Sequence, residues 1–308
     1  MTGLLWLLAA HAVAFRAAAG IAGRFGWSSV GQDLLVNLFL LFLLLVGFTL
    51  LNWIGTRQGS VRYANALPKR ATDREEWSRG AVIGWAAALA AVVPMVIAGA
   101  LQPQFSWAGA AWGGVIASIL SLAFGALASE VAFRGFLFSR LIDATGPTTA
   151  TILMAGIYAL IASLGPNGTG LSFVVTIIAG VLFSMAYLRT HALWLGWGMH
   201  FAWAAATAVL FGLPNSGVAS YSTVVQTTTT GPVWLTGGVY GPDGAFFTAI
   251  VPAGYPMDVP PPQAHVAMEQ AATAKAATLV QIAPASGSNG LEPQSLPESA
   301  SSESAHRP

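Results

Sequence analysis

Long apolar stretches, separated by short polar or basic segments, dominate the chain. The clearest one, Leu34 to Ile54, would extend roughly 30 Å as a helix, which matches the hydrocarbon core of a bilayer. Similar stretches cover residues 3–22, 80–101, 107–128, 149–164, 171–188 and 192–212, and a shorter one at 233–252 is interrupted by glycines. The pattern predicts seven or eight transmembrane helices, with the N-terminal run retained as the first.

The same stretches favour helices over strands. They lack the polar–apolar alternation of barrel strands and are far too long for them. Since backbone groups in lipid must be satisfied within the structure, we expect an all-α fold, a polytopic transmembrane helix bundle. Small residues would let its helices approach closely. The candidates are Gly80, Gly84, Gly114, Gly125, Gly156, Gly180, Gly196 and Gly198.

Composition agrees with this class of protein. Only 8% of the residues are charged and the mean hydropathy is +0.65, values typical of multi-pass membrane proteins. The net charge of +1 gives no indication of nucleic-acid binding. Because the sequence has no cysteine, disulfides, thiolate metal ligands and a cysteine nucleophile are excluded.

Basic residues predict the orientation of the bundle. Six Lys and Arg side chains occur in residues 55–79, whereas the connection at 102–106 carries no charge. The positive-inside rule therefore places 55–79 in the cytoplasm. Alternation from there puts Arg140 and Arg189 inside, puts 213–232 outside, and returns the C-terminal tail to the cytoplasm if the last span crosses.

Four regions follow from these patterns. They are an N-terminal two-helix region with its cytoplasmic loop (1–79), a membrane core (80–212), an extracytoplasmic connector with a short last span (213–254), and a tail (255–308). The tail is poor in large apolar residues, so we expect it to be disordered apart from a transient helix over Ala267 to Ile282.

The connector is predicted to contain a short extended piece at 224–230, followed by tight turns. We favour a packed connector in which Trp234 is an interfacial anchor. A lid over the outer mouth of the bundle is the alternative.

Two charged residues, Glu130 and Arg134, directly follow an apolar run. A charge at membrane depth costs at least about 2.5 kcal/mol. On a helix the two side chains would share one face and neutralise each other. Two interpretations of this pair therefore stay open, a structural ion pair and a functional site. His200, within the predicted span 192–212, is either a polar contact between helices or a metal ligand or general base that faces Glu130.

These residues resemble the CPBP family, the membrane-embedded CAAX-processing and bacteriocin-processing proteases also called Abi proteins. Residues 129–136, Ser-Glu-Val-Ala-Phe-Arg-Gly-Phe, are similar to its first motif, Glu-Glu-x-x-x-Arg. Residues 187–195 and then His200 are similar to its third block, in which a Leu-Arg-x-x-(Gly/Ser)-Leu-Trp segment leads into a helix bearing His-x-x-x-Asn. The resemblance covers roughly 80–212. It implies a multi-pass protein of the bacterial cytoplasmic membrane and metal-dependent peptide hydrolysis by a Glu and two His residues.

Three positions depart from the family pattern. Ser129 stands where the first Glu belongs, Ala162 where the middle motif, Phe-x-x-x-His, has its His, and Ala204 where the final Asn belongs. The residual catalytic positions are Glu130, Arg134 and His200, and His200 is also the remaining metal-ligand candidate.

No neighbouring residue replaces the missing middle His. Between Asp143 and Arg189 there is no Asp, Glu, Lys, His or Cys, and Asp143 itself is expected to be solvated beside Arg140. His191 lies at a predicted membrane boundary and should point elsewhere. An open catalytic metal site normally keeps three protein ligands, so we expect no cofactor, with a divalent metal such as zinc bound only if the protein is active.

Three functions stay open. We favour a pseudoenzyme that uses the family cavity as a scaffold for a transmembrane or lipidated peptide or a partner protein. The second is an active intramembrane metal-dependent endopeptidase that cleaves membrane-associated peptides. The third is a transporter, which the lack of a convincing internal repeat disfavours.

Overall fold

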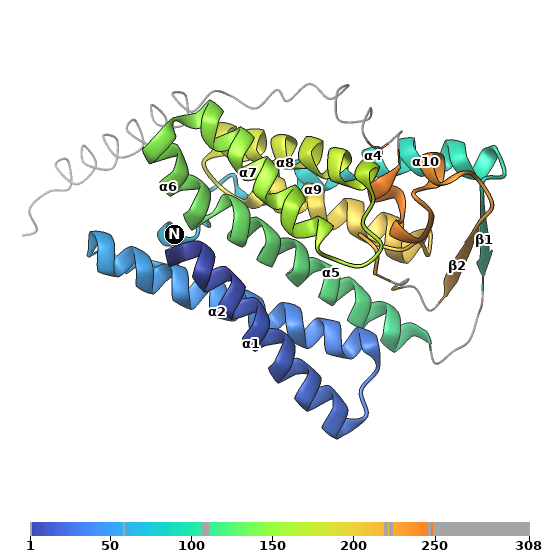
Figure 1. Ribbon diagram of the computed structural model, residues 1–308, viewed down its shortest axis with the longest axis horizontal. Helices are drawn as coiled ribbons and strands as arrows, with labels where there is room; N and C mark the ends of the chain where they lie inside the picture. Colours follow the sequence, from blue (N-terminus) through green and yellow to red (C-terminus); the bar gives the residue numbers. More distant parts are fainter. Residues whose placement is uncertain are drawn as a thin grey trace, which may run out of the picture. The chain divides into compact units, whose positions relative to one another are not determined.

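The computed structural model describes residues 2–57, 59–105, 111–218, 221, 224–245 and 248. These residues form a bundle of apolar helices (Figure 1). Its longer members are α1 (Thr2–Phe25), α2 (Ser29–Thr56), α4 (Asp73–Ile97), α5 (Ala111–Arg134) and α8 (Gly170–Thr190). Its shorter members are α3 (Val61–Ala64), α6 (Phe136–Thr145), α7 (Pro147–Ser163) and α9 (Trp194–Ala205), which ends in a π-helical turn, η1 (Ala206–Leu210). The predicted α-helical bundle is confirmed.

Seven of the predicted spans coincide with helices. Five segments are long and apolar enough to cross a membrane, namely Thr2–Phe25, Ser29–Thr56, Asp73–Ile97, Trp112–Thr145 and Gly170–Thr190. The other two spans correspond to the shorter α7 and to α9 with its π-helical turn. The protein is therefore an integral, multi-pass membrane protein by the length and composition of its helices.

The predicted last span at 233–252 is wrong over its described part. One helical turn, α10 (Val233–Thr236), is followed by two 3-10 turns, η2 (Gly238–Tyr240) and η3 (Pro242–Gly244). Three glycines in this part have positive φ angles, 76° at Gly237, 55° at Gly238 and 91° at Gly241. Such angles end a right-handed helix, so the apolar composition there does not produce a continuous span.

Several helices extend beyond the predicted apolar stretches, and the extensions of α4 and α5 carry charged residues. Helix α4 starts at Asp73 rather than near residue 80, with three acidic residues in its first turn, where negative charge complements the helix dipole. Helix α5 continues beyond residue 128 to Arg134. This extension places both Glu130 and Arg134 on a membrane helix rather than in a connection.

Close packing of α4 against α9 organises the centre of the bundle. A Cβ on Gly84 would lie 2.3 Å from the carbonyl oxygen of Met199, and one on Gly198 would lie 2.2 Å from that of Trp77. Glycines on both helices thus allow backbone-to-backbone contact. The prediction that helix backbones approach closely is confirmed at Gly80, Gly84, Gly180 and Gly198, whereas at Gly125 and Gly196 the close neighbours are the side chains of Asn37 and Glu130. It is wrong at Gly156, around which a Cβ would meet nothing within 4 Å.

Two further packing groups complete the bundle. Helix α2 packs against both α1 and α5, and α7 packs along α8, as Figure 1 shows. The largest apolar cluster joins α1, α2 and α5 to α6 and α7, with Leu44, Phe48 and Phe138 fully buried in it.

Basic residues from distant segments gather at one end of the bundle, here called the basic end. Arg70 donates to the carbonyl oxygen of Thr190 at 2.7 Å, and Arg140 donates to Oδ1 of Asn52 at 2.7 Å. The loop after α2, helix α6 and the end of α8 therefore meet there, as the distribution of basic residues predicted. Asp143 lies beside Arg140 at 3.7 Å and is exposed, which confirms its prediction as a solvated charge.

The opposite end carries the connector. Strand β1 (Leu101–Phe105) pairs antiparallel with β2 (Val225–Thr229), with Leu101 opposite Thr229 and Phe105 opposite Val225. The predicted extended piece is therefore present as β2. The predicted disordered tail, 255–308, lies outside the described residues.

A buried Glu-Arg-His cluster beside a membrane cavity

Glu130 and Arg134 form a buried ion pair on the last turns of α5. Nη1 of Arg134 lies 3.6 Å from Oε1 of Glu130, and the two residues are 1% and 0% exposed. Their four-residue spacing on one helix brings them to the same face. Opposite charges so deeply buried must compensate each other because neither can be solvated.

Aromatic rings supply much of the surroundings of Arg134. Its guanidinium carbon lies 4.4 Å from the ring centre of Tyr158, 5.1 Å from that of Phe183 and 5.9 Å from that of Phe133. Nη2 donates a long, 3.4 Å hydrogen bond to the carbonyl oxygen of Gly180, while Nε and Nη1 make no hydrogen bond within the described part of the chain. Cation–π contacts thus stabilise the charge of a guanidinium group that makes few hydrogen bonds.

His200 completes the cluster from α9. Its Nδ1 lies 3.0 Å from Oε1 of Glu130, and its ring stacks on Phe183 at 5.0 Å between ring centres. An ionised carboxylate only accepts hydrogen bonds, so toward such a carboxylate Nδ1 of His200 is the donor. His200 therefore makes a polar contact between α9 and α5 and faces Glu130, a geometry that fits both interpretations of this residue.

Gly196, one turn before His200, makes this approach of α9 to α5 feasible. A Cβ at Gly196 would lie 3.2 Å from Oε2 of Glu130. Sequence reasoning identified Gly196 only as a packing residue, because its closeness to Glu130 depends on how α9 packs.

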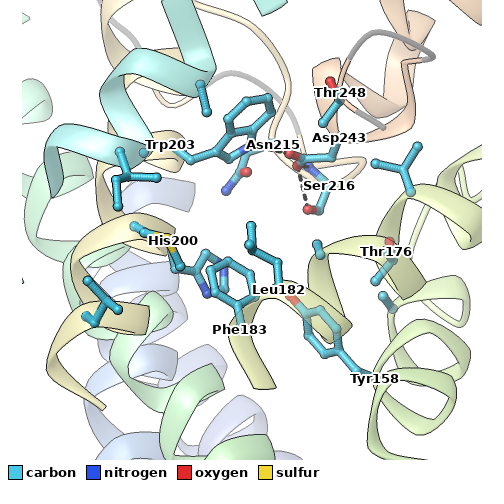
Figure 2. Close-up of a pocket in the computed structure, with 18 of the residues that line it drawn as sticks. Tyr158, Thr176, Leu182, Phe183, His200, Trp203, Asn215, Ser216, Asp243 and Thr248 are labelled. Carbon is cyan, nitrogen blue, oxygen red and sulfur yellow. Dashed lines mark hydrogen bonds between the residues drawn. The ribbon is translucent and has the colours of Figure 1, made fainter. Parts of the chain in front are cut away.

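A cavity of about 590 Å³ lies beside the cluster. Helices α4, α7, α8 and α9 line it, together with the connector, and His200, Phe183 and Tyr158 line its wall in Figure 2. Most of the other lining side chains are aliphatic, among them Val82, Ile83, Val175, Leu182, Leu195 and Met199. The Glu-Arg pair lies behind this wall, so His200 is the member of the cluster that reaches the cavity.

The three departures from the family pattern occupy different places. Ala162 lines the cavity and presents a methyl group there. Ser129 hydrogen-bonds Tyr158. Ala204 is 3% exposed and packs in a separate apolar cluster with Leu122. Only Ala162 therefore lies where its change alters the wall of the cavity.

His191 lies away from the cluster, as predicted. It caps the C-terminus of α8 in the left-handed conformation (φ 49°), and its ring is 6.0 Å from that of Tyr187.

The residues present do not fit a catalytic metal. Glu130 and His200 are the two possible ligands in the cluster, and within the described ranges no three or more His, Asp or Glu side chains gather around one point. The Arg134 guanidinium lies 3.6 Å from the same oxygen that His200 contacts, and its positive charge disfavours a metal cation. Three protein ligands, the usual number in an open zinc site, are not assembled here.

A second polar group, which sequence reasoning missed, lies where the connector meets the cavity. Asp243 accepts hydrogen bonds from Nε1 of Trp203 at 2.5 Å, from the backbone N–H of Ser216 at 2.8 Å and from its Oγ at 2.7 Å. Asp243, Ser216 and Trp203 all line the cavity (Figure 2). In the sequence, Asp243 belongs to a Gly-Pro-Asp-Gly turn, and nothing in that pattern indicates contact with residues 203 and 216.

Tyr240, also beside the cavity, shares this environment. Burial raises the pKa of Tyr240, and the negative charge of Asp243 raises it further, against hydrogen bonds with Thr176, Ser216 and Ser172 that lower it. The tyrosine therefore stays neutral and acts as a hydrogen-bonding group that ties the connector to α8.

These features define a class of protein: a multi-pass α-helical membrane protein with a buried Glu-Arg-His cluster beside an apolar cavity. Residues 111–206 match a family model described as type II CAAX prenyl endopeptidase, Rce1-like. The match runs from α5 to the end of α9, contains all three members of the cluster, and supports the resemblance to the CAAX-protease (CPBP) family that the motifs of this part of the chain predicted. Comparisons with curated proteins and with solved structures gave no match.

Proposed function

We propose that this protein is a CAAX-protease-family member in the bacterial cytoplasmic membrane that has lost ordinary metal-dependent peptidase activity and acts as a binding scaffold. One observation carries the proposal: at the position of the family's middle His, Ala162 presents a methyl group to the cavity. A cavity is present, while the possible metal ligands beside it in the described part of the chain are Glu130 and His200.

The remaining polar cluster suits a structural role. Glu130 interacts with both Arg134 and His200, so it links α5 to α9 at the wall of the cavity. A carboxylate engaged in this way is held by two partners and is poorly placed to activate water.

The apolar lining indicates what the scaffold binds. Its walls are mainly Val, Ile, Leu, Met and Phe side chains, and Val82, which lines the cavity from α4, is 68% exposed. A lining residue exposed within a membrane-spanning helix gives a ligand access from the lipid. The scaffold would therefore take a membrane-resident partner with an apolar part, such as a transmembrane or lipidated peptide.

Metal content and peptide cleavage test this proposal together. The purified wild type, Glu130→Gln and His200→Ala proteins would be assayed in detergent for bound divalent metal and for cleavage of a membrane-peptide library. We expect no stoichiometric metal and no cleavage in any of the three. Stoichiometric metal in the wild type, with cleavage lost in both variants, would overturn the proposal and establish a peptidase with an unusual ligand set.

A metal-independent hydrolase is the second candidate, and the Glu130–His200 contact favours it. A His oriented by a carboxylate through Nδ1 can act as a general base through Nε2. Cleavage without bound metal, lost in His200→Ala, would support this candidate against the scaffold.

A further inference from the structure

Asp243 is an acidic side chain without a cationic partner at the connector end of the cavity. Trp203 and Ser216 supply three hydrogen-bond donors to its two oxygens. No Lys, Arg or His side chain in the described part of the chain forms an ion pair with it. Its negative charge is therefore oriented by neutral donors and is not neutralised.

The groups around Asp243 extend this site. Asn215, Thr248 and Tyr240 also line the cavity there, as Figure 2 shows for the first two. Aromatic rings beside a carboxylate are the combination that binds alkylammonium groups, because ring and carboxylate both attract the cation. Trp203 and Tyr240 provide such rings.

From Asp243 the cavity continues toward the basic end as an apolar passage. Its lining residues on α4 run from Ser78 to Ala87, a length of roughly 13 Å at 1.5 Å per residue. Arg79, at the far end, is already paired with Glu75 at 2.6 Å. The chemistry of the cavity is thus asymmetric, with free negative charge at one end and an apolar wall over most of its length.

The volume of the cavity limits its occupant. A helix about 10 Å across would fill 590 Å³ in roughly 7–8 Å, or about five residues. A transmembrane helix therefore cannot be enclosed, whereas 590 Å³ is the usual size of a small-molecule site. A single-chain amphiphile fits both the size and the lining.

We infer that the cavity binds a single-chain alkylammonium amphiphile, with its cationic head group at Asp243 and its apolar chain along α4 and α8 toward His200. This inference rests on the proposed scaffold function and names the class of ligand. The head group replaces the missing counter-ion of Asp243, and the chain covers the aliphatic wall.

Binding of matched amphiphiles tests the inference. Full-length protein in a neutral detergent would be loaded with tritiated dodecyltrimethylammonium, and unlabelled dodecyltrimethylammonium, dodecanol and dodecyl sulfate would compete for it. A charge-assisted contact should favour the ammonium head over the alcohol by about tenfold or more. Asp243→Asn should bring the ratio of the affinity for the ammonium compound to that for dodecanol close to one. Asp33→Asn, which changes an acid outside the cavity, should leave this ratio unchanged.

The outcomes separate the inference from the function on which it rests. Ala179→Phe, which fills the cavity from α8, should abolish binding of every chain. If the chains bind saturably and Ala179→Phe blocks them, but dodecanol competes as well as the ammonium compound, the inference is wrong and the scaffold stands. If no chain binds in a way that Ala179→Phe blocks, the inference is wrong, and the proposed scaffold function fails with it only if transmembrane and lipidated peptides also show no binding that Ala179→Phe blocks.

Two further results would also overturn the inference. One is an equal loss of head-group preference in Asp33→Asn and Asp243→Asn. The other is binding of a lysine-bearing apolar peptide with no binding of the ammonium compound. Should Asp243→Asn fail to fold, the ratio of ammonium to alcohol affinity measured on the wild type decides whether the inference stands.

Discussion

Nδ1 of His200 lies 3.0 Å from Oε1 of Glu130, although 70 positions separate the two residues in the sequence. The same oxygen is 3.6 Å from Nη1 of Arg134. One carboxylate therefore joins two helices and serves as the only acidic partner of two basic groups in the cluster. The cluster behaves as a unit in which a change to one member alters the environment of the other two.

Removing one charge of the buried pair should strongly destabilise the bundle. Arg134→Met leaves Glu130 buried with His200 as its only basic partner, and loss of one member of a buried pair typically costs about 3–5 kcal/mol. The double variant Glu130→Gln with Arg134→Met should cost less than the sum of the two single changes, because neither residue then keeps an unpaired charge. Thermal unfolding in detergent measures these differences.

The Glu75–Arg79 pair is a matched control for this prediction. It has the same four-residue spacing, but its side chains are 59% and 54% exposed. An exposed pair contributes about 0–1 kcal/mol, so Arg79→Met should change the unfolding temperature little. Equal effects of Arg79→Met and Arg134→Met on the unfolding temperature would show that burial does not set how much the Glu130–Arg134 pair contributes to stability.

Enlarging a glycine between α4 and α9 should disrupt the bundle. Gly84→Val places a side chain where a Cβ alone would lie 2.3 Å from the carbonyl oxygen of Met199. Since that oxygen belongs to helical backbone, the helices must separate, and we expect loss of folded protein measured by size-exclusion chromatography. Gly156→Val, at a position with nothing within 4 Å, is the control and should remain monodisperse.

The hydrogen bond between Trp203 and Asp243 should hold the connector against the bundle. Trp203→Phe keeps an aromatic ring but removes the N–H that donates to Asp243 at 2.5 Å. We expect faster cleavage within 213–245 by an added protease, with the helices still resistant. Trp234→Phe, which changes a tryptophan that is 56% exposed, should leave the cleavage rate as in the wild type.

Single cysteines can test the predicted orientation, because the native sequence has none. Ser60→Cys lies in the loop after α2 and Thr228→Cys lies on β2, and both positions are exposed. A membrane-impermeant maleimide should label Thr228→Cys in intact cells and Ser60→Cys only after permeabilisation. The reverse pattern would contradict the positive-inside prediction.

Restoring the family residues should restore a metal site. Ser129→Glu combined with Ala162→His supplies a carboxylate beside Tyr158 and a His on the cavity wall, at two of the three positions that depart from the family pattern. We expect about one zinc per chain in this variant by elemental analysis, since it has the ligands for three-residue coordination. Ser129→Glu with Gly156→His adds the same groups but puts the His on open space rather than in the cavity, and it should bind none.

The sequence by itself determined the class of protein and most of its helices. Apolar length and the small number of charges suffice for this, because lipid leaves a spanning segment little choice but a helix. Spacing alone also put Glu130 and Arg134 on one helical face. The same reasoning was wrong for the described part of 233–252, where positive φ angles at Gly237, Gly238 and Gly241 interrupt the helix.

Only the tertiary structure decided how distant residues combine. The contact of His200 with Glu130 depends on the approach of α9 to α5, which Gly196 permits. The position of Ala162 on the cavity wall and the meeting of Asp243 with Trp203 depend equally on packing. Local sequence fixes the periodicity of each helix and the residues that share its faces. Which faces meet is set by contacts between segments far apart in the chain, and no local pattern encodes them.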